Sequence, residues 1–366
     1  MHESAGRPPV WRGPLVEIDR VECVEPAGVL DFLAAYGLAG EPRGQRGDIG
    51  VALLVGARGC AQLGGVPLGA ASPVGVPECV AVAYRTGGTA PGRPAGATVG
   101  RWATTWSDAE HADTVERVRE AIARGDVYQA NVVGHRSAPF QGDPAALAAA
   151  VRALPGAWYG GALAGDGWAV ASASPEQLVR VAGDRVTTVP IKGTSVDEAW
   201  LRASAKDQAE HVMIVDLERN DLARVTRPGS VVVEELYGLS QWSGLWHASS
   251  TVAGELALGV TVVEILRALL PGGSVTGAPK HAACGLLADL EPVGRGPAMG
   301  TLGFIWPGGL DLGLTIRTIA AADERVHLWA GGGITWGSEP ASEVVEAHAK
   351  AAPVQRALAQ VRPSSS

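Results

Sequence analysis

The sequence has little cysteine: 4 residues in 366, with 5% aromatic residues. Cys23, Cys60, Cys79 and Cys284 are scattered and form no CxxC pair. Neither a zinc site nor a disulfide framework is therefore indicated. Free thiols are typical of a reducing compartment, and we expect a cytoplasmic protein.

The chain also lacks an excess of basic residues. Its 30 lysines and arginines stand against 38 acidic residues, giving a formal net charge of −8. Nucleic acids and anionic membranes attract basic surfaces, so neither is an expected partner. The first residues, MHESAGRPPVW, contain no apolar signal-peptide core, and no apolar run reaches membrane-spanning length. An acidic protein that binds an anionic small molecule must concentrate positive charge locally or use a metal ion.

The pattern of helices and strands predicts an α+β fold. A segment rich in glycine and proline, residues 85–101, separates a shorter N-terminal subdomain (1–100) from a core (101–366) with dense secondary structure. Irregular alternation of the two element types favours a layered sandwich over a strict βαβ series. The expected strands are 51–56, 79–84, 128–133, 167–171, 178–181, 185–191, 230–236, 300–305, 312–318 and 326–331. The expected helices are 27–36, 107–124, 144–153, 201–217, 262–269, 279–290 and 342–360.

Two predicted helices carry carboxylates three residues apart. Asp207 and Glu210 form one pair, Glu343 and Glu346 form the other, and Lys350 follows one turn later. Residues at this spacing share a helix face, so the two pairs could clamp a cation such as Mg²⁺. The same spacing is also typical of solvated amphipathic helices.

Two glycine-rich loops could bring backbone N–H groups to an anionic ligand. "PGGSVTGAPK" (271–280) precedes a predicted helix, and it differs from a nucleotide-binding P-loop because Ala278 and Pro279 separate its last glycine from the lysine. "AGGGIT" (330–335) precedes the helix that carries Glu343. Either loop could equally be a structural turn.

Four further residues could take part in chemistry. Arg317 lies in an apolar predicted strand, so it needs a carboxylate partner from the protein or from a ligand. His247 could titrate near neutral pH, and Glu176 could be a catalytic acid; both could also be structural. Lys192, in "VPIKGT", could act as a nucleophile if burial lowered its pKa, or could simply extend to solvent.

Several motifs together resemble the chorismate-utilising enzymes, which include anthranilate, aminodeoxychorismate, isochorismate and salicylate synthases. They are "YQANVV", "SPEQL", "PIKGT", "AEHVMIVDLERNDLARV", "PGGSVTGAPK", "GTLGF…LDLGLTIRT" and "AGGGITWGSEPASEVVEAHAKA". They follow the family's order over 106–359. The resemblance implies a sandwich of two large β-sheets packed face to face, with helices outside.

The resemblance also implies roles for residues. Glu210, Glu343 and Glu346 would bind Mg²⁺, with Asp207 as a further acidic site residue. The groups matching substrate contacts are Thr276, Gly277, Arg317, Gly332, Gly333 and Lys350. Glu176 would be the catalytic acid, and His247 would lie near the departing C4 hydroxyl of chorismate.

Two positions distinguish the branches of this family. Members that use water as nucleophile carry a lysine where this chain has Gln129, so the chain resembles the amine-forming branch. Anthranilate synthases usually carry alanine at the position of Lys192, whereas aminodeoxychorismate synthases carry lysine. A lysine adduct at C2 would direct ammonia to C4, giving 4-amino-4-deoxychorismate, the precursor of p-aminobenzoate. Because this attack needs a neutral amine, we expect an apolar pocket and a lowered pKa for Lys192.

Some features depart from the family pattern. Ser195 and Val196 follow the lysine motif, and Ala298 replaces a tyrosine that usually faces the substrate. No feedback-inhibition motif for tryptophan is found. Cys284 lies in a predicted helix without the setting of a glutaminase nucleophile, so the chain should use free ammonia or ammonia from a separate glutamine amidotransferase subunit. The alternatives are anthranilate or 2-amino-2-deoxyisochorismate synthase component I, and a non-catalytic partner subunit of a glutaminase.

Overall fold

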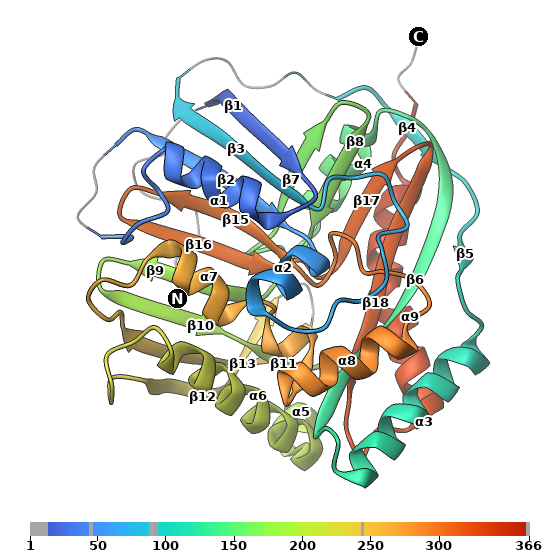
Figure 1. Cartoon of the computed structure of the whole chain (residues 1–366). Coiled ribbons are helices and arrows are strands. Elements are labelled where there is room, and N and C mark those ends of the chain that lie inside the picture. Colours follow the sequence, from blue (N-terminus) through green and yellow to red (C-terminus); the bar gives the residue numbers. More distant parts are fainter. Residues whose placement is uncertain (1–13, 44–46, 88–91, 93, 243–244, 364–366) are drawn as a thin grey trace.

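The computed structural model describes residues 14–43, 47–87, 92, 94–242 and 245–363. Within these residues the strands form a 10-stranded and an 8-stranded sheet, and the pairings are antiparallel (Figure 1). Both sheets have helices on their outer faces. The expected α+β sandwich is therefore confirmed.

The first sheet has the order β1-β3-β2-β15-β16-β9-β10-β13-β11, and β12 also pairs with β13. Its strands from the N-terminal part are β1 (Leu15–Cys23), β2 (Ile49–Val55) and β3 (Cys79–Thr86). The others are β9 (Gln177–Ala182), β10 (Arg185–Val189), β11 (Ile191–Ser195), β12 (Val232–Trp242), β13 (Leu245–Glu255), β15 (Thr301–Trp306) and β16 (Gly309–Leu314). Because β2 pairs with β15, the N-terminal strands β1, β2 and β3 join a sheet that also contains strands of the core.

The second sheet has the order β14-β6-β18-β17-β8-β7, and β4 and β5 also pair with β6. Its strands are β4 (Ala97–Val99), β5 (Ala103–Thr104), β6 (Gln129–Gly142), β7 (Gly161–Gly165), β8 (Trp168–Ser172), β14 (Gly277–Ala278), β17 (Thr318–Ala322) and β18 (Arg325–Ile334). Successive side chains of β8 point to opposite faces of the sheet. Trp168 and Val170 belong to the core between the sheets, whereas Ala169 and Ala171 pack towards the outer helices.

The helices begin and end at local signals. They are α1 (Pro26–Ala35), α2 (Ala57–Gly64), α3 (Asp108–Arg124), α4 (Pro144–Arg152), α5 (Glu198–Ala203), α6 (Ala205–Ala223), α7 (Val262–Leu269), α8 (Lys280–Leu290) and α9 (Pro340–Ala359). In α3, Ser107 and Glu110 form a capping box, and Gly125 ends the helix at φ 82°. No helix in the described part of the chain is both long and apolar enough to cross a membrane.

Some predicted elements differ from the structure, and some strands and helices were not predicted. The helix expected at 201–217 is two helices, because Ser204 ends α5 and its side chain caps α6. The strand expected at 312–318 is interrupted, and Arg317 lies between β16 and β17 with φ 52°. No strand was expected at β13, which lies between β10 and β11 in the sheet.

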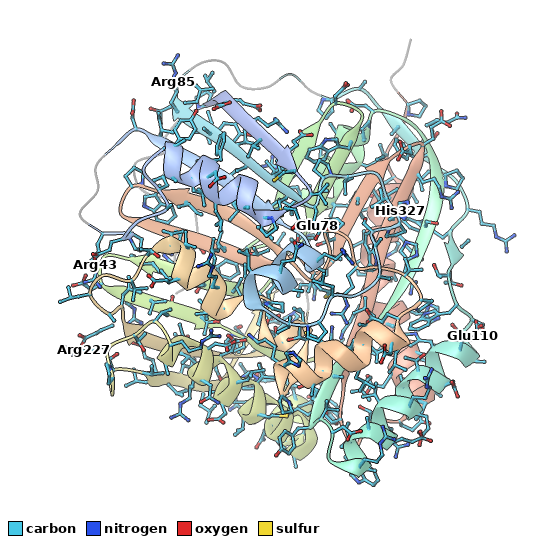
Figure 2. All side chains as sticks on the ribbon, in the orientation of Figure 1. Arg43, Glu78, Arg85, Glu110, Arg227 and His327 are labelled. Atoms are coloured by element: carbon cyan, nitrogen blue, oxygen red, sulfur yellow. The ribbon has the colours of Figure 1, made fainter. Side chains whose placement is uncertain are left out.

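Charged side chains gather at the rim of the molecule. Figure 2 shows Arg85, Glu110 and Arg227 at its periphery, and all three are exposed. Among the described residues, three of the buried acidic side chains, Glu210, Glu218 and Asp221, come instead from α6.

Candidate active site

Lys192 lies at the edge of the first sheet, opposite the second. It belongs to β11, and its Nζ lies 2.8 Å from Glu210 Oε2 on α6. A Cβ on Gly333 of β18 would lie 3.2 Å from the same Nζ. The site is therefore built where one edge of the first sheet meets the glycine-rich end of β18.

The surroundings of Lys192 are acidic. Desolvation lowers its pKa, but Glu210, Glu346 and Glu343 more than offset this effect, and the pKa is raised above its usual value. The expected apolar pocket and lowered pKa were therefore wrong for this arrangement. The cause is the carboxylates, which lie far from Lys192 in sequence.

Glu343 and Glu346 project from α9 towards β18. A Cβ on Gly332 would lie 3.2 Å from Glu343 Oε2 and 3.6 Å from Glu346 Oε1. Glycine at this position therefore leaves room for both carboxylates and for anything that they bind. Lys350 Nζ lies 2.6 Å from Glu346 Oε1 and donates to the Gly331 carbonyl at 2.9 Å.

Glu210 faces the same region from the opposite side. Thr335 Oγ1 donates to Glu210 Oε1 at 3.0 Å, in addition to the ion pair with Lys192. The described residues contain no preassembled group of three acidic, histidine or cysteine side chains suited to a metal ion. Asp207, expected as a further acidic site residue, accepts instead from the Ser204 hydroxyl at 2.5 Å.

Glu176 is a buried carboxyl group, 5% exposed, directly before β9. Burial raises its pKa to about 7, although Ser274, the Ile191 backbone and the charges of Lys192 and Lys350 oppose the rise. A carboxyl group with this pKa is partly protonated at neutral pH and can donate a proton.

His247 and Arg317 lie close enough for their charges to interact, and Arg317 also interacts with Glu176. His247 is 1% exposed on β13, opposite Thr194 of β11. Burial lowers its pKa to about 4, and the Arg317 charge adds to this effect. The pKa of Arg317 is itself lowered by burial, while Glu176 opposes that change. His247 is therefore neutral near pH 7, whereas Glu176 keeps a transferable proton.

The loop that contains Thr276 and Gly277 packs against β6. Thr276 is buried, and its hydroxyl donates to the Gly272 carbonyl at 2.8 Å. Gly277 has φ 144° and pairs with Ala130. Its lack of a side chain is required there, because a Cβ would overlap the Gln129 carbonyl. Ala298, where a substrate-facing tyrosine was expected, is 1% exposed in the core between the sheets.

Comparison with known proteins identifies the family. Residues 81–356 match the family model described as chorismate binding enzyme. The chain belongs to the chorismate-binding enzyme family. The resemblance deduced from the motifs is therefore confirmed.

Named relatives fall into two groups. Over 257 residues the chain is 41% identical to anthranilate synthase component 1 of Streptomyces coelicolor, covering 67% of this chain and 50% of that protein. Over 272 residues it is 36% identical to aminodeoxychorismate synthase component 1 of Bacillus subtilis, covering 71% and 58%. The chain thus spans between half and three-fifths of the length of these relatives.

The fold agrees with solved structures. Anthranilate synthase component I from Streptococcus pneumoniae superposes with a TM-score of 0.78 at 25% identity, covering 89% of this chain and 85% of that one. An isochorismate synthase from Bacillus anthracis, at 22% identity, superposes with a TM-score of 0.68 and shares the fold.

Sequence reasoning missed several buried charged residues. Glu218, Asp221, Lys280, Glu291 and Arg295 all lie within the loops and helices around the site. Glu218 and Asp221 stand in a strongly charged segment, 216–224, and the other three stand next to glycine or proline, so no local pattern marked them as buried.

Proposed function

We propose that the chain is an aminodeoxychorismate synthase component I, which aminates chorismate at C4. The observation that carries this proposal is the position of Lys192, an amine between the acidic wall of α6 and α9 and the glycines of β18. Relatives named aminodeoxychorismate synthase component 1 support it.

In the proposed mechanism, neutral Lys192 attacks C2 of chorismate. Both conjugated double bonds of the ring shift, the C4–O bond breaks, and Glu176 donates the proton with which the hydroxyl leaves as water. Ammonia then attacks C4, both double bonds shift back, and the C2–N bond to Lys192 breaks. Two allylic displacements thus leave the new amine at C4.

His247 and Arg317 have different tasks in this scheme. Neutral His247 can donate or accept a hydrogen bond at the C4 oxygen but cannot supply a proton near pH 7. Arg317, together with the backbone of Gly277, Gly332 and Gly333 and the side chains of Thr276 and Lys350, would hold the carboxylates of the substrate.

The site also suits Mg²⁺ by its chemistry. Glu210, Glu343 and Glu346 offer the carboxylate oxygens that Mg²⁺ prefers, and Gly332 leaves room between α9 and β18. These three residues would hold the ion, which when bound would neutralise the charge of the dianionic substrate. Asp207 would contribute negative charge from α6.

Ammonia would come from a separate glutamine amidotransferase subunit, in keeping with relatives named component 1. We place the protein in the cytoplasm, where its four free thiols would stay reduced. The product would be the precursor of p-aminobenzoate, for folate or a specialised metabolite.

A second candidate is anthranilate synthase component I. A 41% identical relative carries that name. The raised pKa of Lys192 also favours it, because a lysine held as an ammonium cannot attack C2.

One assay separates these functions. The purified chain is incubated with chorismate, Mg²⁺ and ammonium, and aminodeoxychorismate lyase is then added. p-Aminobenzoate supports the first function, anthranilate the second, and unchanged chorismate a non-catalytic subunit. Lys192→Ala should lose the covalent adduct and the C4 product; formation of p-aminobenzoate at the wild-type rate would exclude Lys192 as the nucleophile.

A further inference from the structure

A buried ion pair lies directly behind the loop that contains Thr276. Arg295 donates through Nε to Glu291 Oε2 and through Nη2 to Glu291 Oε1, both at 2.7 Å. The two side chains are 11% and 8% exposed. This two-point pairing fixes the plane of the guanidinium group.

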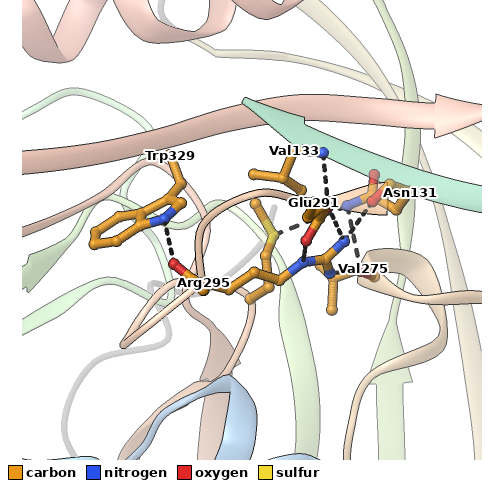
Figure 3. Close-up of polar contacts among 8 residues, drawn as sticks. Asn131, Val133, Val275, Glu291, Arg295 and Trp329 are labelled. Atoms are coloured by element: carbon orange, nitrogen blue, oxygen red, sulfur yellow. Dashed lines mark hydrogen bonds and ion pairs between the residues drawn. The ribbon is translucent and has the colours of Figure 1, made fainter. Parts of the chain in front are cut away.

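The same pair contacts two other segments. Arg295 Nη1 donates to the Val275 carbonyl at 2.7 Å, and Nη2 donates to the Asn131 carbonyl at 2.5 Å. Glu291 Oε1 accepts from the Val133 amide at 3.0 Å. Figure 3 shows the contacts of the Arg295 guanidinium group and the separate contact from the Val133 amide to Glu291. We call the Glu291–Arg295 pair and its contacts to Val275, Asn131 and Val133 the clasp.

Each segment held by the clasp continues into the candidate site. Val275 directly precedes Thr276 and Gly277. The backbone N–H of Asn131 donates to the Thr276 carbonyl at 2.9 Å, and Asn131 pairs with Gly333 in the neighbouring strand. The clasp therefore fixes where the 273–278 loop lies relative to the glycines of β18.

The chemistry of the pair suits this task. The guanidinium group has five donors in a rigid plane, so it can bind a carboxylate on one edge and two carbonyls on the other. Lysine has three donors on one nitrogen and cannot span the same acceptors. Because the charges are buried, loss of either partner leaves the other without compensation.

We propose that Glu291 and Arg295 are positioning residues for chorismate binding, which hold Thr276 and Gly277 against β6 at the distance that the substrate requires. Neither residue touches the substrate. This inference rests on the proposed function for its kinetic test, but not for its structural test.

A hollow beside the clasp makes a rescue experiment possible. Arg295, Glu291 and Thr276 line a small hollow of about 50 Å³ that is partly open to solvent, and its wall also includes Arg58 and Gly69. A small planar cation could therefore reach the volume vacated by a truncated Arg295.

The kinetic test compares Arg295→Ala and Arg295→Lys with wild-type protein. We expect the KM for chorismate to rise about tenfold or more in Arg295→Ala, with a smaller change in kcat, because only substrate placement is lost. Arg295→Lys keeps the positive charge, but its KM for chorismate should stay nearly as high as that of Arg295→Ala. Millimolar guanidinium should lower the KM of Arg295→Ala but not that of Arg295→Lys.

The matched control is Arg227→Ala, which removes an exposed arginine paired with Glu255. An unchanged KM in folded Arg295→Ala would overturn the proposal.

The structural test is amide hydrogen exchange. In Arg295→Ala the amides of Asn131 and Val133 should exchange faster, guanidinium should slow them, and amides of α4 should not change. Faster exchange without any amino product from the wild type would refute the proposed function alone. Unchanged exchange would refute the clasp, whichever product forms. If Arg295→Ala does not fold, Glu291→Gln serves instead, because it keeps an acceptor for the Val133 amide and removes only the charge.

Discussion

Lys192 Nζ lies 2.8 Å from Glu210 Oε2, so the expected nucleophile and an expected metal ligand form an ion pair with each other. Neither can perform its proposed task in that arrangement. The Lys192 amine must lose a proton before it can attack. The Glu210 carboxylate must move away from Lys192 before it can bind a metal ion. A ligand that draws Glu210 away would lower the pKa of Lys192, so the two proposed tasks are linked.

This relationship predicts how Mg²⁺ affects stability. Lys192→Met removes the ammonium that faces Glu210, with Glu343 and Glu346 close by. In EDTA we expect the variant to be about 1–3 kcal/mol less stable than the wild type, the usual cost of removing one partner of a buried polar contact. Because the lysine no longer competes for Glu210, Mg²⁺ should raise the Tm of the variant more than that of the wild type. Thermal scans with EDTA and with Mg²⁺ measure this; equal shifts would contradict the competition.

The raised pKa of Glu176 predicts a pH dependence of activity. The carboxyl group is protonated below its pKa of about 7 and ionised above it, so a proton donor is lost as the pH rises. The neutral fraction of Lys192 grows with pH, so at a constant concentration of free ammonia we expect kcat to rise up to about pH 7 and to level off above it, in a limb set by Glu176. Glu176→Gln should lower kcat about 10²–10⁴-fold and remove this limb of the profile. Retention of the limb in the variant would assign it to another group.

A second buried pair predicts a loss of stability. Lys280 Nζ lies 2.7 Å from Asp221 Oδ2, and the side chains are 14% and 10% exposed. Lys280→Met should lower the free energy of unfolding by about 3 kcal/mol, because Asp221 and the neighbouring Glu218 lose their cation. The double variant Lys280→Met/Asp221→Asn should be more stable than Lys280→Met alone, as measured by urea denaturation.

The matched control for that pair is Arg227→Ala. Arg227 and Glu255 are 65% and 57% exposed, so the loss should be below about 1 kcal/mol. Equal losses for the buried and the exposed pair would show that burial does not set the cost.

Glu218 predicts how stability varies with pH. Burial, with the charge of Asp221 adding to it, raises the pKa of Glu218 from 4.5 to about 8. Between these values the folded state holds a proton that the unfolded state has lost, so the wild type should lose stability as the pH rises. Glu218→Gln lacks this group and should show a smaller fall. The loss of unfolding free energy between about pH 5 and pH 8, measured by denaturation, should be larger in the wild type than in Glu218→Gln by on the order of a few kcal/mol. Parallel curves would contradict a raised pKa.

Elements with local signals could be predicted from the sequence. The bounds of α7 were expected at 262–269 and are Val262–Leu269, where Thr261 and Glu264 form a capping box. Ser204 carried a similar signal, three residues before Asp207, that would have separated α5 from α6. In contrast, β13 contains many small and polar residues, and its position depends on pairing with β10, β11 and β12.

The chemistry of the site was visible in residue types, but its electrostatics were not. Lys192 and Glu210 belong to a strand and a helix whose contact no periodicity encodes. Glu291 and Arg295 stand four residues apart in sequence, yet their other partners are backbone carbonyls and an amide from distant segments. The tight turn of Arg317 at φ 52° was equally hidden, because arginine rarely adopts it.

The candidate site is assembled from both sheets and from helices, and this affects how activity is gained during folding and lost during unfolding. Lys192 and His247 come from one sheet, Gly332 and Gly333 from the other, and the acidic residues from helices on opposite sides. No contiguous piece of the chain holds enough of these groups to work alone. Activity should therefore appear only at the last step of assembly and disappear at the first step of unfolding, which would make turnover an early reporter of damage to the protein.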